Sequence, residues 1–118
     1  MRTALVFVTL LALGFAPISW RSSHRTVVAT GYCPCAICCG THDNVTSTGT
    51  DARRPGVATD PRVIPLGSRL DIPGVGSWLP ADDIGGAIKR DRIDVRFATH
   101  AEARAFGKKR LEIRVWTK

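Results

Sequence analysis

The residues best suited to chemistry lie in one stretch, Asp82–Phe97, which reads DDIGGAIKRDRIDVRF. Two of its carboxylates, Asp83 and Asp94, are separated by a glycine pair and a run of basic residues. Gly85 and Gly86 relax the backbone where the chain must turn tightly or let a ligand approach closely. Two carboxylates that a turn brings near one another are what acid/base chemistry on sugars requires.

The strand after this turn decides how Asp94 is presented. Its apolar residues alternate, so Asp94 and Arg96 are expected on the face opposite to Ile93 and Val95. This arrangement predicts that Asp83 and Asp94 lie at the two ends of one loop, and that the loop leads into a strand of a barrel-like sheet. The alternative is a plain hairpin, in which the aspartates are solvated or paired with nearby basic residues, namely Lys89, Arg90 and Arg92.

Length and charge limit the classes of function. The chain has 118 residues, which allow one small domain. Its formal net charge of +7 favours an anionic partner: nucleic acid, acidic lipid or a cell-wall polymer. The sequence shows no RNA-binding aromatic signature, zinc-finger spacing or basic helix, so a nucleic-acid partner is not expected.

The N-terminal segment has the character of an export signal. Residues 4–20 are apolar and uncharged, and Arg2 precedes them. Residues 1–20 are therefore predicted to be a signal peptide or a membrane anchor, which would be the only contact with a membrane. A buried N-terminal helix or strand is the alternative. Residues 21–25 are expected to be a polar linker, and residues 26–118 the folded domain.

All four cysteines fall within seven residues: Cys33, Cys35, Cys38 and Cys39. In an exported protein, an even number of clustered cysteines favours two local disulfides. Zinc binding, with His42 as a further ligand, and redox-active or free thiols are the alternatives. The spacing is tighter than the two separated pairs of a zinc ribbon or finger. We therefore expect disulfides, and neither a metal nor another cofactor.

The remaining pattern predicts a mainly all-β fold with one short helix. Six strands are expected, at residues 26–32, 56–59, 68–72, 77–79, 93–97 and 111–116. Thr99 and Glu102 form a capping box for a helix that runs to Phe106 and ends at Gly107. Short strands with glycine and proline turns between them are typical of a small closed β-barrel.

Three other features have less specific interpretations. Residues 41–50 form a polar loop whose hydroxyl groups could line a polysaccharide groove or simply be solvated. Trp78 is expected to pack in the core or at its rim, although an exposed Trp78 could stack on a sugar. His100, in the first helical turn, is expected to be a surface residue.

Several motifs resemble the 3D domain, a family named for three aspartates. The matching segments are GVATDPRVIPLGSRLDIPG at residues 56–74, DDIGGAIK at 82–89, RID at 92–94, and the helix–glycine–strand tail. The opening ATGYCPCAICCG is similar to the cysteine-bearing start of a subset of this family. The chain is also similar to the catalytic barrel of membrane-bound lytic transglycosylase A and, more loosely, to rare-lipoprotein-A-like domains. The resemblance covers roughly residues 26–116 and implies a six-stranded double-psi β-barrel.

The resemblance assigns roles to particular residues. The three aspartates fall on Asp60, Asp83 and Asp94, and Asp94, in the RID motif, matches the family's catalytic carboxylate. Two positions depart from the family pattern, because Ile84 stands where threonine is usual and Arg90 where glycine is usual. Contact with the substrate is expected from the glycine pair and two basic residues, Gly85, Gly86, Lys89 and Arg92. Two aspartates lie outside the pattern and are interpreted as solvated turn residues, Asp82 and Asp91.

The activity that the resemblance implies is lytic cleavage of peptidoglycan glycan strands, at the cell envelope of a bacterium. Asp94 would act as general acid and then as general base, forming a 1,6-anhydro ring. For this role its pKa must be raised, by burial and by repulsion from Asp83 and Asp60, against the opposing charges of Lys89, Arg92 and Arg96. A non-catalytic wall-binding module is the alternative. An aspartic peptidase is not favoured, because only Asp83 carries a D-x-G-like signal.

Overall fold

The computed structural model describes residues 17–35 and 44–118. The predicted signal peptide or anchor over residues 1–20 therefore lies mostly outside the described residues, and so do Cys38, Cys39 and His42. Within the described ranges, no helix combines the length and the apolar character that crossing a membrane requires.

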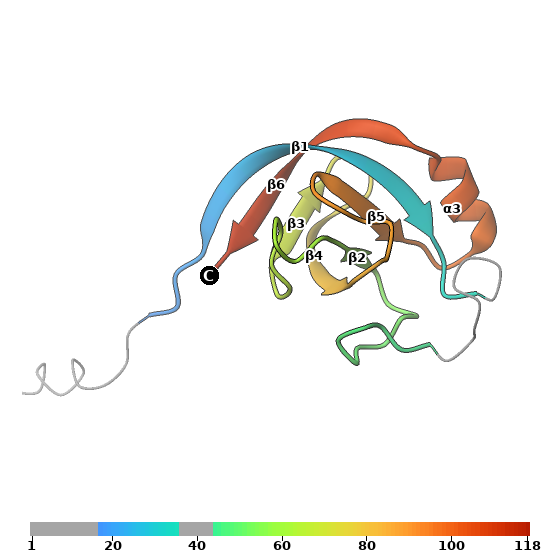
Figure 1. The fold of residues 1–118 in the computed structure, drawn as a ribbon, viewed down its shortest axis with the longest axis horizontal. Coiled ribbons are helices and arrows are strands. Elements are labelled where there is room, and N and C mark those ends of the chain that lie inside the picture. The colour runs from blue at the N-terminus through green and yellow to red at the C-terminus, as the bar shows by residue number, and fades with distance from the viewer. Residues whose placement is uncertain (1–16, 36–43) are drawn as a thin grey trace, which may run out of the picture.

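Six strands close into a barrel (Figure 1). Around the barrel they follow the order β1–β5–β2–β4–β3–β6, and β6 pairs with β1 to complete the ring. A closed ring leaves no strand edge open to other chains. The strands are β1 (Arg21–Tyr32), β2 (Gly56–Ala58), β3 (Arg69–Ile72), β4 (Gly76–Asp83), β5 (Arg92–Arg96) and β6 (Lys109–Thr117).

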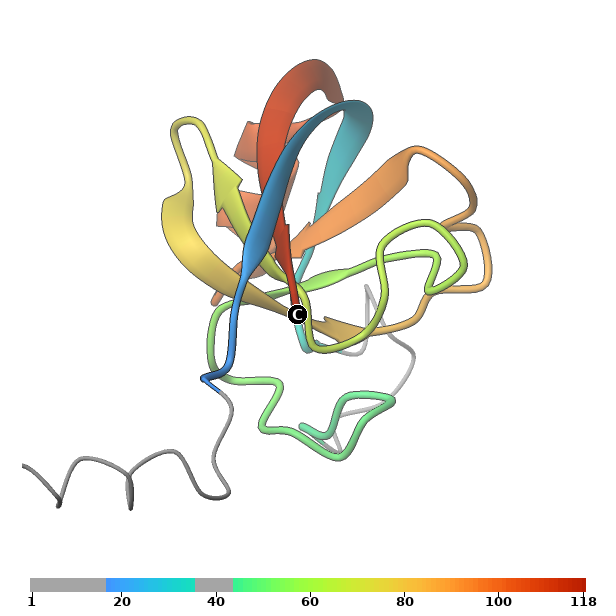
Figure 2. The same cartoon turned by 90° about the vertical axis from the view of Figure 1, so that its left-hand side faces the viewer.

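Strand directions are mixed. β1 runs parallel to β5, and β2 runs parallel to β4, whereas the other neighbouring pairs are antiparallel. β6 returns along almost the whole of β1, so that Thr117 pairs with Arg21 and the C-terminus lies beside the start of β1 (Figure 2). The expected mainly-β barrel is confirmed, and this closed six-stranded arrangement is consistent with the double-psi barrel.

Apolar alternation in the strands produces the core. Ile93 and Val95 of β5 are at most 1% exposed, as their spacing predicts, and Ile113 and Val115 of β6 are buried in the same interior. The core cluster is completed by residues from the other strands and one turn: Val27, Ala29, Val57, Ile64, Leu70, Ile72 and Ala81.

The described part of the chain contains one helix, α3 (His100–Phe106). Its N-cap is Thr99, whose side chain accepts a hydrogen bond from the backbone N–H of Glu102 and donates one to the Glu102 carboxylate. Gly107 ends the helix with a φ of 69°, a left-handed value that favours glycine. The predicted capping box and helix end are confirmed.

Two sequence-based expectations are wrong. Residues 21–25 are not a linker, because they form the first part of β1 and pair with β6. β4 also continues to Asp83, well beyond the predicted end at residue 79. In both places the deciding partner is a strand distant in sequence, so local polarity was a poor guide.

Trp78 is 44% exposed and is not a core residue. Its ring packs against those of Trp20 and Trp116, with centroids 4.9 Å and 5.8 Å away. The Trp116 indole N–H in turn donates to the Asp71 carboxylate. The three tryptophans therefore form an outer aromatic cluster.

Candidate functional site

Strand order brings Asp83 and Asp94 together. β2 lies between β4 and β5, and its Ala58 pairs with Asp83 on one side and with Asp94 on the other. Neighbouring strands are about 4.8 Å apart, so the backbones of the two aspartates are about 10 Å apart across the sheet. A short central strand thus places two carboxylates from different segments on either side of one residue.

Asp94 is half-buried in β5. Its Oδ1 accepts a hydrogen bond of 3.0 Å from the hydroxyl of Thr30, its register partner on β1. Burial raises the pKa of Asp94, and the negative charge of Asp83 adds to the effect. The Thr30 hydrogen bond and the positive charge of Arg92 lower this pKa, but they offset the rise only in part.

Asp83 has the opposite electrostatic balance. Burial raises its pKa, but several hydrogen bonds to the carboxylate outweigh burial, so that the pKa of Asp83 is lowered. Ser47 donates to Oδ1 from both its N–H (2.9 Å) and its hydroxyl (2.6 Å), and Ile84 donates its N–H at 2.9 Å. The Tyr32 hydroxyl donates to Oδ2 at 2.7 Å. As pH rises, Asp83 therefore loses its proton before Asp94 does.

Behind Tyr32 lies a buried ion pair that the sequence analysis missed. Asp82 and Arg96 are only 7% and 4% exposed, so the interpretation of Asp82 as a solvated turn residue is wrong. Their contact is bidentate, with N–O distances of 3.0 Å and 2.8 Å. Thr50 donates to the Asp82 carboxylate, and Arg96 donates to the Tyr32 hydroxyl. Burial lowers the pKa of Arg96, but its contacts with Asp82 and Tyr32 outweigh this and raise it.

Gly56 makes room for this pair. A Cβ at Gly56 would lie 2.1 Å from Nη2 of Arg96 and 2.6 Å from Oδ1 of Asp82. Any larger residue would therefore push the guanidinium away from its carboxylate. The glycine that opens the GVATD motif is explained by a close approach rather than by a turn.

Asp60 is 3% exposed and is fully engaged by neighbouring groups. Its carboxylate accepts from the backbone N–H and the guanidinium of Arg62 and, at 2.8 Å, from the backbone N–H of Arg90. The Arg62 hydrogen bonds, together with the Arg90 bond, lower the pKa of Asp60. Asp60 thus joins the turn after β2 to the loop before β5. The charges that shift the pKa of Asp94 are those of Arg92 and Asp83.

The other expected substrate-binding residues lie in the loop between β4 and β5 and, for Arg92, at the start of β5. Gly85 is needed for packing, because a Cβ there would lie 2.8 Å from the Ile88 side chain, whereas Gly86 faces open space. Lys89 is exposed, and Arg92 is half-buried beside Asp94. Asp91 is exposed, as expected, and forms an ion pair with Arg25.

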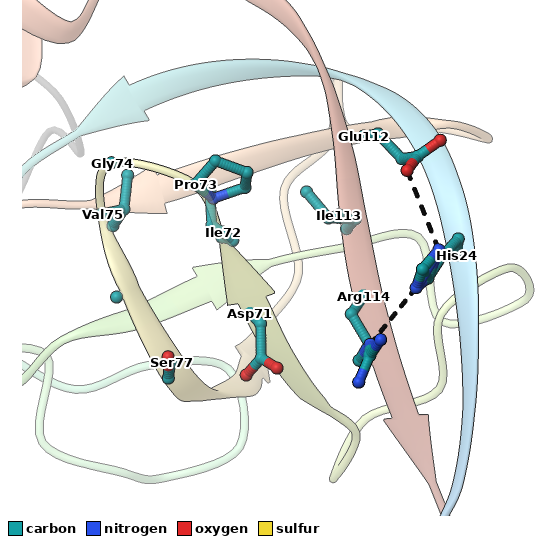
Figure 3. A pocket seen from close by; sticks show the side chains of 11 residues that line it. His24, Asp71, Ile72, Pro73, Gly74, Val75, Ser77, Glu112, Ile113 and Arg114 are labelled. Atoms are coloured by element: carbon teal, nitrogen blue, oxygen red, sulfur yellow. Dashed lines mark hydrogen bonds and ion pairs between the residues drawn. The ribbon is translucent and has the colours of Figure 1, made fainter.

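A separate hollow of the described surface lies away from these residues. It encloses about 550 Å³ between the β3–β4 turn and the crossing of β1 and β6 (Figure 3). His24 stands on one wall, where it contacts Glu112 and accepts a hydrogen bond from Arg114. None of the three family aspartates lines this hollow. Groups able to bind a metal gather at a third place, where Cys33, Cys35 and His100 bring ligand atoms within 4.8 Å of one another.

The residues that sequence reasoning missed share one property: each meets the aspartates through long-range pairing. Thr30 and Tyr32 reach the site from β1, and Ser47 reaches it from the segment before β2. One signal was available, because Arg96 lies two positions after Asp94 and so belongs to the same strand face. The hydroxyl-rich loop at residues 41–50 also had the appropriate chemistry, and its Ser47 does contact Asp83.

Comparison with known proteins agrees with this architecture. The family model named "3D domain" matches residues 56–117, which include all three aspartates. The chain is 39% identical over 98 residues to "Cell wall-binding protein YocH" of Bacillus subtilis (strain 168), which covers 80% of this chain and 33% of that protein. It is 37% identical over 94 residues to "Putative cell wall shaping protein YabE" of the same organism, covering 76% of this chain and 22% of that protein.

A third relative, described as "SPbeta prophage-derived uncharacterized protein YorM" of Bacillus subtilis (strain 168), is 37% identical over 100 residues. That match covers 77% of this chain and 41% of the relative. The chain thus spans less than half the length of each of these three curated relatives. By the family match over more than half of its residues, and by the closed barrel that carries the three aspartates, the chain belongs to the 3D domain family.

Proposed function

We propose that this protein acts on peptidoglycan at the cell envelope as a lytic transglycosylase-like enzyme. It cleaves the β-1,4 bond between N-acetylmuramic acid and N-acetylglucosamine and closes a 1,6-anhydro ring. The relatives named for binding or shaping the cell wall support the substrate class. The observation that carries the chemistry is the pair Asp94 and Asp83, whose pKa values are shifted in opposite directions.

In the first step Asp94 acts as the general acid. Its raised pKa keeps the carboxyl group protonated closer to neutral pH than an exposed aspartate. The proton passes to the glycosidic oxygen, the C1–O bond breaks, and positive charge develops at the anomeric carbon. Asp83, held ionised by Ser47, Ile84 and Tyr32, supplies negative charge on the same side of the barrel.

In the second step Asp94 acts as the general base. The 6-hydroxyl of the muramic acid attacks C1, and its proton returns to the Asp94 carboxylate. The carboxyl group is thereby regenerated, and no water or separate nucleophile is consumed. The product carries a 1,6-anhydro ring, which distinguishes this route from hydrolysis.

The other predicted residues have supporting roles in this proposal. Asp60 holds the loop of Arg90 in place through its backbone hydrogen bond. That loop carries Gly86 and Lys89, which are open to solvent and available to a glycan strand. The positive charge of Arg92 lowers the pKa of Asp94, and in this proposal its guanidinium also binds the glycan.

Asp94→Asn tests the assignment. Isolated peptidoglycan is incubated with the wild type or the variant, and soluble muropeptides are analysed by mass spectrometry. The wild type should release anhydromuropeptides, and Asp94→Asn should release none above the background, because the amide can neither donate nor accept the proton. Asp91→Asn, a change at the nearby exposed aspartate, is the matched control and should retain release. Anhydro products from Asp94→Asn at the wild-type level would refute Asp94 as the acid.

A wall-binding module without cleavage is the second candidate. Two observations favour it: one relative is named as a cell wall-binding protein, and the three aspartates do not line the hollow of about 550 Å³. A shallow surface can hold a glycan strand without distorting a sugar ring. Co-sedimentation with isolated walls separates the two candidates. Equal sedimentation of the wild type and Asp94→Asn, with no anhydro product from either, would make the protein a binding module.

A further inference from the structure

A second group of reactive side chains lies where β1 ends beside α3 (Figure 1). Cys33 directly follows β1 and is fully buried, and His100 is the first residue of α3. The Sγ atom of Cys33 and the Nδ1 atom of His100 are 4.0 Å apart. With Cys35, the three side chains place their ligand atoms within 4.8 Å of one another.

The fold holds these groups in position from several directions. Gly31 lets β1 pass very close to the helix, because a Cβ there would lie 2.9 Å from the backbone oxygen of Ala103. The backbone N–H of Phe97 donates to the carbonyl of Tyr32 at 2.7 Å, which connects the chain before α3 to the end of β1. The Thr99 cap sets where the helix begins, and therefore where His100 stands. Packed backbone therefore fixes the positions of Cys33 and His100, and Cys35 follows Cys33 by two residues.

We infer that Cys33, Cys35 and His100 bind a zinc ion. Thiolate sulfur and imidazole nitrogen are the ligands that zinc prefers, usually in tetrahedral geometry. In tetrahedral geometry, zinc–sulfur and zinc–nitrogen bonds of about 2.3 and 2.0 Å put neighbouring S and N ligand atoms about 3.5 Å apart, and two sulfurs about 3.8 Å apart. In the structure the Cys33 and His100 ligand atoms are 4.0 Å apart and all three ligand atoms lie within 4.8 Å of one another, so a modest contraction of the side chains would bring three ligands to one ion.

Zinc binding at this cluster releases the protons of the two thiols. On binding, the two thiols lose their protons to solvent, and His100 coordinates through the lone pair of Nδ1, which leaves its proton on Nε2. The ion compensates the charge of the Cys33 thiolate, which would otherwise be costly at a fully buried position. The fourth coordination position is open to a water molecule or another donor.

The ion would join two elements that are distant in sequence. Cys33 and Cys35 follow β1, whereas His100 opens α3, and the residue before Cys33 is Tyr32, the hydrogen-bond donor to Asp83. A zinc clamp therefore steadies the end of β1 next to the aspartate site without taking part in proton transfer. This inference does not depend on the proposed function, because metal content is measured without any substrate.

Metal analysis of the full chain tests the inference. The protein is purified in detergent without chelators, and zinc is quantified by inductively coupled plasma mass spectrometry. We expect about one zinc ion per chain for the wild type. Titration with zinc against a chromophoric chelator should show an affinity loss of at least about 100-fold in His100→Ala, more than is usual for changes outside the ligand shell. His24→Ala, at an exposed histidine of β1, is the matched control and should bind zinc as the wild type does.

A second measurement needs no variant. Cobalt is substituted for zinc in the wild type, and it should give the visible absorption of a tetrahedral ion and the near-ultraviolet band of thiolate ligation. Bound zinc should also slow alkylation of Cys33 and Cys35, and a chelator should restore it. A metal-free protein whose intact mass and peptide map show Cys33 or Cys35 in a disulfide would overturn the inference. Undiminished zinc affinity in His100→Ala would overturn it as well.

Discussion

Asp94 and Asp83 are chemically identical side chains with opposite tendencies to hold a proton. Asp94 is half-buried and receives one side-chain hydrogen bond, from Thr30, so burial dominates and raises its pKa. Asp83 receives hydrogen bonds from two backbone N–H groups and two hydroxyl groups, and these together outweigh burial. Hydrogen bonds to an ionised carboxylate favour the ionised form, so the number of donors decides the difference. Such divergence is typical of carboxyl pairs with distinct acid and charge-stabilising roles.

This balance predicts the pH dependence of cleavage. Asp94 must be protonated to act, so activity should fall as pH rises through the pKa of Asp94. Thr30→Val removes a hydrogen bond that favours the ionised form, so the pKa of Asp94 rises further. The alkaline limb of the pH–rate profile should then move to higher pH, as measured by anhydromuropeptide release across a buffer series. Asp83→Asn removes a repelling charge and should move the same limb to lower pH. Shifts of the same sign in both variants would contradict the assignment.

The buried pair Asp82–Arg96 concerns stability more than chemistry. Breaking a buried ion pair from one side leaves an uncompensated charge, which costs about 3–5 kcal/mol. Asp82→Asn should therefore lower the free energy of unfolding by about that amount, because Arg96 stays buried between Tyr32 and the backbone oxygen of Arg54. Urea denaturation followed by tryptophan fluorescence measures the change. The control Asp91→Asn removes an exposed pair with Arg25, and its effect should be far smaller.

At the scale of elements, the loop between β4 and β5 contains one strained residue. Arg90 has a φ of 58°, in the left-handed region that residues with a Cβ rarely adopt. Its backbone N–H is held by Asp60, which explains how the conformation is maintained. Glycine, the usual residue of the resembled pattern at this position, fits this backbone without strain.

Arg90→Gly should accordingly stabilise the protein. A left-handed backbone costs roughly 1–2 kcal/mol for a residue with a Cβ, and glycine removes this cost. The greater freedom of glycine in the unfolded chain opposes folding by about 0.4–1 kcal/mol. The expected net gain is about 0.5–1 kcal/mol, measured by urea denaturation. Lys89→Gly, at the neighbouring residue without a positive φ, should destabilise instead. A loss of stability in Arg90→Gly would show that the arginine side chain makes a compensating contact.

At the scale of the whole molecule, barrel closure creates the site. The two parallel pairings, β1 with β5 and β2 with β4, join strands that lie far apart in the sequence. Together with the antiparallel pairing of β2 with β5, they bring Thr30 to Asp94, Tyr32 to Arg96, and Asp83 and Asp94 to either side of Ala58. Closure also removes Asp82 and Arg96 from water, and it places the end of β1 against α3.

Local patterns in the sequence were sufficient for several features. Alternation placed Ile93 and Val95 on one face, and both are core residues, because strand periodicity depends only on neighbours along the chain. The Thr99 cap and the Gly107 end were likewise predicted from residues within one or two helical turns. The three aspartates were found through motif resemblance, and burial and the charge of Asp83 were named in advance as causes of a raised pKa at Asp94.

Only the tertiary structure decided which groups meet. Strand register and burial depend on pairing across 64 residues between β1 and β5 and across 80 to 96 residues between β1 and β6, which periodicity does not report. Asp82 therefore looked like a solvated turn residue, residues 21–25 looked like a linker, and His100 looked like a surface histidine far from Cys33. Whether a carboxylate is solvated, paired or repelled is decided by the surroundings that closure builds. The sequence by itself determined the residue chemistry and the core pattern, and the closed barrel determined which of those residues act together.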